Sequence, residues 1–336
     1  MTNLSSPCTP DSQERVVAIP ADFRLASGQI LAGVVRARLT GPKTGSLIVV
    51  AGGISAGRKA ADSAAGPGWW GWLIGDGAPV DTARHRLLAV DWLPETDIGD
   101  VLTISTADQA RLLALVLDDL GEPVIDAFVG ASYGGCVGLA FAELFPDRIS
   151  RLVVISAAHR AHPAATAWRG VQRRLLQFGL KTGREDDAIA LARELAMTTY
   201  RSPEEFDARF STGDAPDAAG QPYPICDYLV SRGAAYPGQT SARRWIALSD
   251  SLDRHTVAPE AITATLTVVG FISDRLVPVA DSRALADRAA NLARFVEAPS
   301  LYGHDAFLKE RAVIADVITT ALEGLQFSCS SQEIAA

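Results

Sequence analysis

The chain has 336 residues, of which 48% are hydrophobic and 21% are charged, and its formal net charge is −8 at pH 7. This composition excludes disordered, collagen-like and coiled-coil proteins, and the negative charge argues against non-specific nucleic-acid binding. No apolar run approaches the roughly 18 residues of a membrane-spanning helix, the start of the chain lacks the parts of a signal peptide, and the four cysteines form no CxxC pair. We therefore expect a cytoplasmic protein with free thiols that binds neither membrane nor nucleic acid.

The predicted elements begin after a loose tail at residues 1–13. Short β-prone runs that predict antiparallel strands at a sheet edge lie at 16–19, 23–25 and 30–38. Wholly apolar runs, typical of parallel strands buried on both faces, lie at 47–51, 87–90, 125–129, 152–155 and 266–269. Helical patterns at 106–120 and 135–145 alternate with these runs, which predicts a doubly wound α/β fold.

The alternation stops after Ile155, and helix-like segments dominate until strand texture resumes at Thr265. We predict a helical cap at 159–255, inserted into a catalytic domain made of 14–158 and 256–326, with a loose terminus at 327–336. No cluster of His, Cys and Asp has the spacing of metal ligands, and no nucleotide-binding glycine pattern follows a strand. We therefore expect no metal and no permanently bound cofactor.

A candidate nucleophile follows the apolar run at 125–129, in the pattern Gly130-Ala131-Ser132-Tyr133-Gly134. The glycines permit a sharp strand-to-helix turn that exposes the Ser132 hydroxyl above the sheet. The N–H of Tyr133 then points to where an oxyanion forms, and the N–H of Ile54, after the run at 47–51, is the candidate second donor. Cys136, one turn further on, is interpreted as a small buried packing residue.

Enzymes with such a serine turn place an acid and then a histidine later in the chain. Asp274 directly follows the strand predicted around 266–269, and His304 lies thirty residues after it in a polar turn. Asp305 is adjacent to His304 and badly placed to hold its ring, so we assign Asp305 to substrate binding. His255 precedes the returning strand and is interpreted as a histidine on the surface of the cap.

These residues, with several longer blocks, resemble the homoserine O-acyltransferase family of the α/β-hydrolase fold. The resemblance covers about 45–325 and is carried by Gly68-Trp69-Trp70, by 75–82, by the doubled Gly134-Gly135, and by the blocks at 172–173, 196–203 and 303–308. It implies acyl transfer from acyl-coenzyme A to the hydroxyl of an amino acid, homoserine being favoured, through an acyl-Ser132 intermediate. It also implies a Ser132–Asp274–His304 triad and a homodimer formed through the cap, where Trp168, Leu175 and Phe178 are apolar.

The resemblance assigns Arg173 and Asp305 to the carboxylate and the ammonium of the amino acid. Arg169 is four residues before Arg173, so both arginines share one helix face. Arginine can donate two parallel hydrogen bonds to a carboxylate, and aspartate forms an ion pair with an ammonium. The arginines of 160–174, a stretch without acids, also suit the phosphates of coenzyme A.

Two departures from the family pattern leave the acceptor and the donor open. The family's long Gly-Ser-Thr-Gly-Pro segment is replaced by the short stretch 91–97, and Leu180 stands where a tyrosine is frequent. Burying the terminal carboxylate of a succinyl group requires a cation, and Arg58, just beyond Ile54, is the candidate. We favour succinyl-coenzyme A, with acetyl transfer or a serine acceptor as alternatives.

Two other classes of function remain possible on this fold. An esterase or thioesterase would use the same triad but would need neither the arginine pair nor Asp305. A non-catalytic receptor with a cap would bind a ligand without a reactive Ser132.

Overall fold

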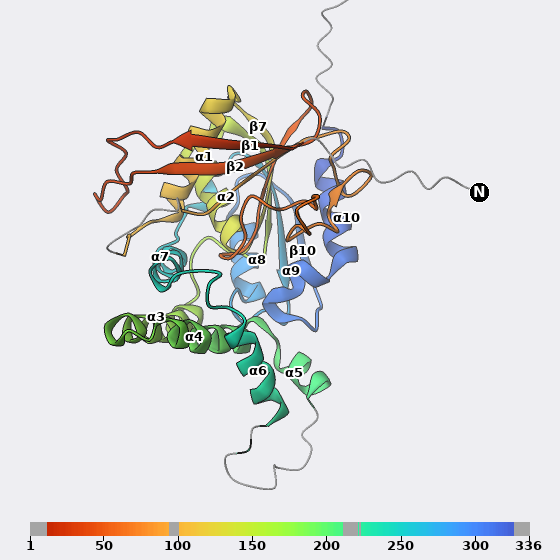
Figure 1. Cartoon of the computed structure of the whole chain (residues 1–336). Helices are drawn as coiled ribbons and strands as arrows, with labels where there is room; N and C mark the ends of the chain where they lie inside the picture. The colour runs from red at the N-terminus through yellow and green to blue at the C-terminus, as the bar shows by residue number, and fades with distance from the viewer. Residues whose placement is uncertain (1–11, 94–100, 211–220, 222, 326–336) are drawn as a thin grey trace, which may run out of the picture.

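A sheet of eight strands forms the centre of the computed structural model, which describes residues 12–93, 101–210, 221 and 223–325 (Figure 1). The strand order is β1-β2-β6-β3-β7-β8-β9-β10. The strands of this sheet are β1 (Ser12–Ala18), β2 (Val34–Thr40), β3 (Leu47–Ala51), β6 (Arg86–Val90), β7 (Ile125–Ala131), β8 (Ile149–Ile155), β9 (Thr265–Phe271) and β10 (Leu292–Ala298). Strand β2 runs antiparallel to both β1 and β6, and the pairs from β6 to β10 are parallel. The predicted α/β fold and the antiparallel edge are thus confirmed.

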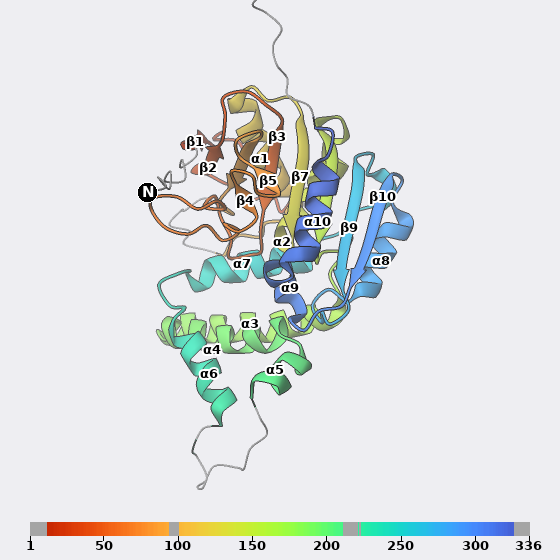
Figure 2. The same cartoon turned by 90° about the vertical axis from the view of Figure 1, so that its right-hand side faces the viewer.

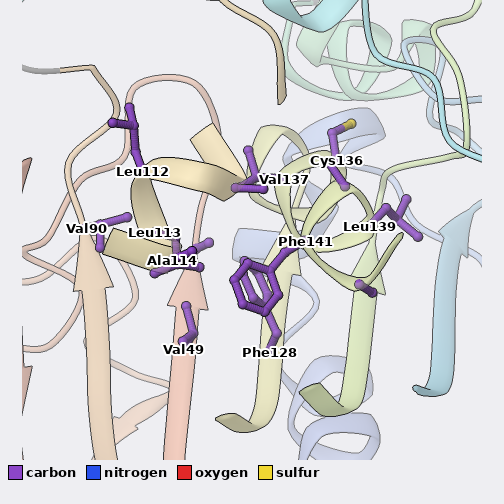
Figure 3. Close-up of a cluster of buried hydrophobic side chains, with 14 of the residues drawn as sticks. Val49, Val90, Leu112, Leu113, Ala114, Phe128, Cys136, Val137, Leu139 and Phe141 are labelled. Carbon is purple, nitrogen blue, oxygen red and sulfur yellow. The ribbon is translucent and has the colours of Figure 1, made fainter. Parts of the chain in front are cut away.

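The central strands are buried because helices cover both faces of the sheet. All five residues of β3 are buried, and Val49 faces one apolar cluster while its neighbours Ile48 and Val50 face another. Figure 3 shows the first cluster, in which Val49 lies near Leu113 and Phe141 from the covering helices. Each large apolar side chain buried in this way contributes about 1.5–3 kcal/mol.

The helices of the core are α1 (Thr106–Leu120), α2 (Tyr133–Leu144), α8 (Val279–Arg288), α9 (Ala306–Lys309) and α10 (Arg311–Leu322). The bounds predicted for α1 are confirmed, because local signals mark both of its ends. Ser105 and Asp108 form a capping box at its start, and Gly121 ends it in the left-handed conformation. Short 3-10 turns are η1 (Pro146–Arg148), η2 (Pro259–Ala261) and η3 (Gly303–Asp305).

Among the described residues between β8 and β9 there are five helices, called the cap helices here: α3 (Pro163–Thr182), α4 (Glu185–Tyr200), α5 (Pro203–Arg209), α6 (Pro224–Ala234) and α7 (Ala242–Asp253). Figures 1 and 2 show α3 to α6 beyond one end of the sheet strands. A separate apolar cluster, including Leu176, Ile189 and Trp245, joins α3, α4 and α7.

The chain enters and leaves the cap helices at adjacent points. The N–H of Val257 donates to the carbonyl of His159 at 2.9 Å, and Arg160 forms an antiparallel bridge with Thr256. His255, interpreted from the sequence as a surface residue, is instead buried at this junction. Its Nε2 lies 3.1 Å from the carbonyl of Ala158, its Nδ1 lies 2.8 Å from the Thr106 hydroxyl, and burial lowers its pKa to about 4.

The edge elements differ in detail from the expectations. The run at 23–25 forms only an isolated bridge between Arg24 and Ile30, and the strand predicted from residue 30 begins at Val34. Ser12 and Gln13, predicted to be part of a loose tail, belong to β1; the rest of that tail, residues 94–97 and 327–336 lie outside the described part. A two-stranded sheet of β4 (Ile74–Gly75) and β5 (Val80–Asp81) was not predicted.

Candidate active site

The proposed nucleophile Ser132 lies in a strained turn between β7 and α2. Its backbone has φ 52° and ψ −119°, a region that residues with a side chain rarely adopt. The flanking glycines are required by space: a Cβ at Gly130 would lie 2.5 Å from the carbonyl oxygen of Gly134, and one at Gly134 would lie 2.2 Å from that of Ala51. The sequence-based interpretation of this turn as a device that exposes Ser132 agrees with its geometry.

Ser132, His304 and Asp274 form one hydrogen-bonded chain. His304 Nε2 lies 2.8 Å from Ser132 Oγ, and His304 Nδ1 lies 2.7 Å from Asp274 Oδ2. The other oxygen of Asp274 accepts the N–H groups of Leu276 and Val277, each at 2.9 Å, so the carboxylate cannot turn away. This arrangement makes Nδ1 the donor to Asp274 and leaves Nε2 to accept the proton of Ser132.

The electrostatics of the chain favour a basic His304. Both His304 and Asp274 are buried. Burial disfavours the charged imidazolium, but the charge of Asp274 and the hydrogen bond to it outweigh burial, so the pKa of His304 is raised above its usual value. The residue before it, Gly303, has φ 57°, and a Cβ there would lie 2.7 Å from the carbonyl oxygen of Tyr200. The turn that places His304 therefore depends on glycine.

Of the two candidate oxyanion donors, the N–H of Tyr133 lies at the start of α2, and the N–H of Ile54 lies in a loop held by hydrogen bonds. The carbonyl of Gly53, in the same peptide unit as the Ile54 N–H, accepts the indole N–H of Trp92 at 3.0 Å and the N–H of Ala56 at 2.9 Å. The ring of Trp92 also packs edge-on against Tyr133, with centroids 5.1 Å apart. The role of Trp92 was missed from the sequence, where it appeared only within a departure from the family pattern.

A cavity of about 310 Å³, called the triad cavity here, opens beside Ser132 and His304. Ile54 lies in its wall, and the cap helices supply most of the opposite side. Those lining residues are Trp168, Arg169, Gln172, Arg193, Met197, Thr199, Tyr200, Arg232, Trp245, Ser249 and Leu252. Cys136 also lines the cavity, and burial raises its pKa to about 12, so its thiol stays protonated. An apolar wall with a few charged groups is typical of a small-molecule site.

Asp305 lies in the wall of the triad cavity, as the sequence suggested for a substrate-binding residue. Burial raises its pKa above the usual value, against the opposing charges of Arg201 and His304. Its nearest cation is Arg201, whose Nη2 lies 3.8 Å from Asp305 Oδ2. The loose ion pair leaves the carboxylate able to accept a further donor from the cavity.

Arg169 and Arg173 converge on a carboxylate of the chain itself. Asp253, at the end of α7, accepts Arg169 Nη2 on one oxygen and Arg173 Nη1 on the other, both at 2.6 Å. Arg173 also donates to the Ser249 hydroxyl at 3.0 Å. Arg169 lines the triad cavity, whereas Arg173 is not among its lining residues. No local sequence signal pointed to Asp253, which lies 80 residues beyond Arg173.

Arg58 lies in a second cavity of about 330 Å³, called the outer cavity here. The two cavities share wall residues, among them Ile54 and Tyr200. The guanidinium of Arg58 is bound to Asp91 and donates to Glu14 at 2.6 Å. Arg58 is therefore next to the triad cavity but not in its wall, and two carboxylates already neutralise it.

Within the described ranges, no group of three or more His, Cys, Asp or Glu side chains is arranged to hold a metal ion. Over the same ranges, no helix is both long and apolar enough to cross a bilayer.

The chain is similar in sequence to a fold-family model and to two homoserine O-acyltransferases. A family model described as the alpha/beta hydrolase fold matches residues 65–310. The chain is 42% identical over 292 residues to the homoserine O-succinyltransferase of Xanthomonas campestris pv. campestris, covering 86% of this chain and 78% of that protein. It is 30% identical to the homoserine O-acetyltransferase of Mycobacterium tuberculosis, covering 76% of this chain and 77% of that protein.

Solved structures show the same fold at low identity. The homoserine O-acetyltransferase from Bacillus anthracis superposes with a TM-score of 0.84 at 14% identity, covering 95% of this chain and all of that one. Esterase E22 superposes equally well, with a TM-score of 0.84 at 16% identity, covering 93% of this chain and all of that one. Acyltransferases and esterases thus share this architecture, and the fold by itself does not separate them.

Proposed function

The chain belongs to the homoserine O-acyltransferase family of the α/β-hydrolase fold, and from this premise we propose that it transfers an acyl group from acyl-coenzyme A to the hydroxyl of L-homoserine in methionine biosynthesis. Succinyl-coenzyme A is the favoured donor, since the 42% identical relative is a succinyltransferase. The observation that carries the proposal is the chain Asp274–His304–Ser132, which opens into a cavity lined by both acidic and basic side chains.

The first half-reaction forms an acyl-enzyme. His304 Nε2 takes the proton of Ser132 as the serine oxygen attacks the thioester carbonyl. The N–H groups of Ile54 and Tyr133 stabilise the oxyanion, and the start of α2 adds a favourable dipole. The tetrahedral intermediate collapses, the C–S bond breaks, and His304 returns the proton to the departing thiolate.

The second half-reaction passes the acyl group to the acceptor. His304 takes the proton of the homoserine hydroxyl, whose oxygen attacks the acyl carbonyl, and Ser132 leaves with that proton. Asp305 pairs with the ammonium. Arg169 and Arg173 share the single negative charge of Asp253, so the trio keeps a net positive charge that favours the acceptor's carboxylate. The cap helices cover Ser132 and limit hydrolysis of the acyl-enzyme.

We propose that the protein acts as a cytoplasmic homodimer through the outer face of α3. Val171 and Phe178 are 49% and 64% exposed there, and exposed apolar patches mark interaction surfaces. Trp168, expected on this face, instead lines the triad cavity, and the guanidinium of Arg275 lies 5.2 Å from its ring centre. Light scattering of the wild type and Phe178→Glu tests the dimer, since the charged variant is expected to be monomeric.

A matrix of donors and acceptors tests the activity. Release of free coenzyme A thiol is measured with acetyl-, propionyl- and succinyl-coenzyme A against homoserine and serine. The expected result is fastest release with succinyl-coenzyme A and homoserine, together with O-succinylhomoserine as product. Thioester hydrolysis that homoserine does not affect would reject transfer in favour of an esterase. Failure of a fluorophosphonate to label Ser132 would favour a receptor.

A further inference from the structure

Arg193 of α4 projects into the triad cavity without a carboxylate partner among the described residues. Its guanidinium carbon lies 5.6 Å from the ring centre of Tyr200 and 4.6 Å from that of Tyr236. Resting on the proposed transfer reaction, we propose that Arg193 is the residue that receives a substrate carboxylate in this cavity. That carboxylate is either the distal one of a dicarboxylic acyl chain or the one of the amino-acid acceptor.

The other arginines around the cavity differ from Arg193 in their partners. Arg169 is bound to Asp253, and Arg201 is bound to Glu205 and lies near Asp305. Arg232 is exposed, so water can satisfy its donors. In this set, Arg193 combines a place in the cavity wall, a buried donor without an acceptor and a positive charge that no described carboxylate offsets.

One donor of Arg193 is also unsatisfied. Its Nε is buried and has no hydrogen-bond partner in the described part of the chain. Buried polar groups in native proteins are nearly always hydrogen-bonded, because an unmade bond costs about 1–3 kcal/mol. The planar guanidinium offers paired donors that match the two oxygens of a carboxylate. A carboxylate bound from the cavity supplies the missing acceptor and the missing negative charge together.

Tyr200 places Arg193 at a useful distance from the reacting atoms. The centre of the Tyr200 ring lies 6.2 Å from that of the His304 imidazole and 5.6 Å from the guanidinium carbon of Arg193. Burial raises the pKa of Tyr200 to about 12, so this tyrosine stays neutral and does not offset the charge of Arg193. Arg193 is thus one tyrosine ring away from the catalytic base, whereas Arg58 lies in the outer cavity and is paired twice.

Succinate tests the site without requiring transfer. The rate at which a fluorophosphonate labels Ser132 is measured at increasing concentrations of succinate or of uncharged succinamide. We expect succinate to protect the wild type and succinamide to protect it far less. Arg193→Met, which removes the charge but keeps length, is expected to need about tenfold or more succinate for the same protection. Arg193→Lys is expected to fall between the two, because its point charge lacks the guanidinium fork.

Arg184→Met is the matched control, because Arg184 precedes the same helix and its side chain is 70% exposed. Labelling rates without succinate and melting temperatures show whether each variant retains its fold. No protection of the wild type by succinate, or equal protection of the wild type and a folded Arg193→Met, would overturn the assignment.

The two half-reactions then identify which carboxylate Arg193 receives. Without acceptor, the mass of the acyl-enzyme is followed with succinyl- and acetyl-coenzyme A. If Arg193 holds the acyl chain, Arg193→Met slows succinylation but not acetylation. If Arg193 holds the acceptor, both acylations are unchanged, and KM rises for homoserine but not for an amino alcohol without a carboxylate. A wild type that forms no acyl-enzyme with any donor refutes the proposed function, whereas protection by succinate still reports on Arg193.

Discussion

The indole Nε1 of Trp92 donates a hydrogen bond to the carbonyl oxygen of Gly53 at 3.0 Å. In a trans peptide the carbonyl and the following N–H point in opposite directions. Trp92 therefore holds the Ile54 N–H facing away from its own indole N–H, and Ile54 lies in the wall of the triad cavity. One tryptophan thus fixes the peptide of one proposed oxyanion donor and packs against Tyr133, whose N–H is the other proposed donor.

Replacing Trp92 by phenylalanine should slow acylation while leaving substrate binding largely unchanged. The variant keeps an aromatic ring but loses the donor to Gly53, while the Ala56 bond to the same oxygen remains. We expect kcat to fall about tenfold with little change in KM, less than the loss of a whole oxyanion donor. Steady-state kinetics measures both constants.

Trp72→Phe is the control for the general cost of removing an indole, because Trp72 packs in the cluster on the other face of the sheet. Its kcat should remain near that of the wild type. An unchanged kcat in a folded Trp92→Phe would show that the Ala56 bond alone is sufficient to hold the peptide.

Asp274→Asn should move the pH dependence of acylation as well as its rate. Acylation needs neutral His304, so its rate falls as the pH drops through the pKa of His304. That pKa is raised by Asp274, and loss of this charge lowers it, so the acid limb should shift to lower pH. The acylation rate on the high-pH plateau should drop about 10⁴-fold, because Asp274 also keeps the proton of neutral His304 on Nδ1.

Single-turnover acylation between pH 5 and 9 measures this profile. Asp281→Asn is a suitable control, since Asp281 is a buried carboxylate near Arg160 and outside the triad. A plateau that drops without any shift of the acid limb would contradict the assigned source of the raised pKa.

Ser132→Gly should be more stable than Ser132→Ala, although both are expected to be inactive. Glycine adopts the φ of 52° without steric strain, whereas the Cβ of alanine is strained at this backbone angle. We expect the free energy of unfolding to be about 1 kcal/mol larger for the glycine variant, measured by denaturant titration. A glycine variant less stable than the alanine variant would show that the turn carries no strain.

Asp253→Asn should destabilise the cap helices. The substitution removes the negative charge that Arg169 and Arg173 share. The side chains of Asp253 and of both arginines are only 8% to 17% exposed, so water compensates little for the loss. Removing one partner of a buried ion pair lowers the free energy of unfolding by about 3 kcal/mol or more. Denaturant unfolding should show this loss.

Asp250→Asn provides the comparison within the same helix. Asp250 pairs with the half-exposed Arg254, and such a pair contributes about 1 kcal/mol or less. Equal losses in the two variants would mean that the Arg169–Asp253–Arg173 trio contributes no more than a surface pair.

The sequence predicted the features that depend on local signals. The apolar run at 47–51 predicted β3, the apolar pattern of 106–120 predicted α1, and the glycines around Ser132 indicated its turn. Asp274 and His304 were found because strand order constrains where an acid and a base can follow.

Partners distant in the chain were not predictable in this way. The pairing of Arg169 with Asp253 depends on how α3 packs on α7, and the burial of His255 depends on its contact with α1. The place of Arg193 between two tyrosines depends in the same way on tertiary packing, because Tyr236 belongs to a different segment of the chain.

The bond between Val257 and His159 also has a consequence for the architecture of the chain. Because the chain leaves the sheet domain and returns to it at adjacent points, the cap helices form one inserted cassette, which also contacts the sheet domain through bonds such as that between Ser251 and Tyr133. Exchanging that cassette between relatives would carry the acceptor-facing wall of the triad cavity with it, while the strand order, the Ser132 turn and the Asp274–His304 pair stay with the host. We expect such an exchange to transfer the contribution of the cap helices to acceptor preference, while Asp305, proposed to bind the ammonium, stays with the acyl-transfer residues of the host.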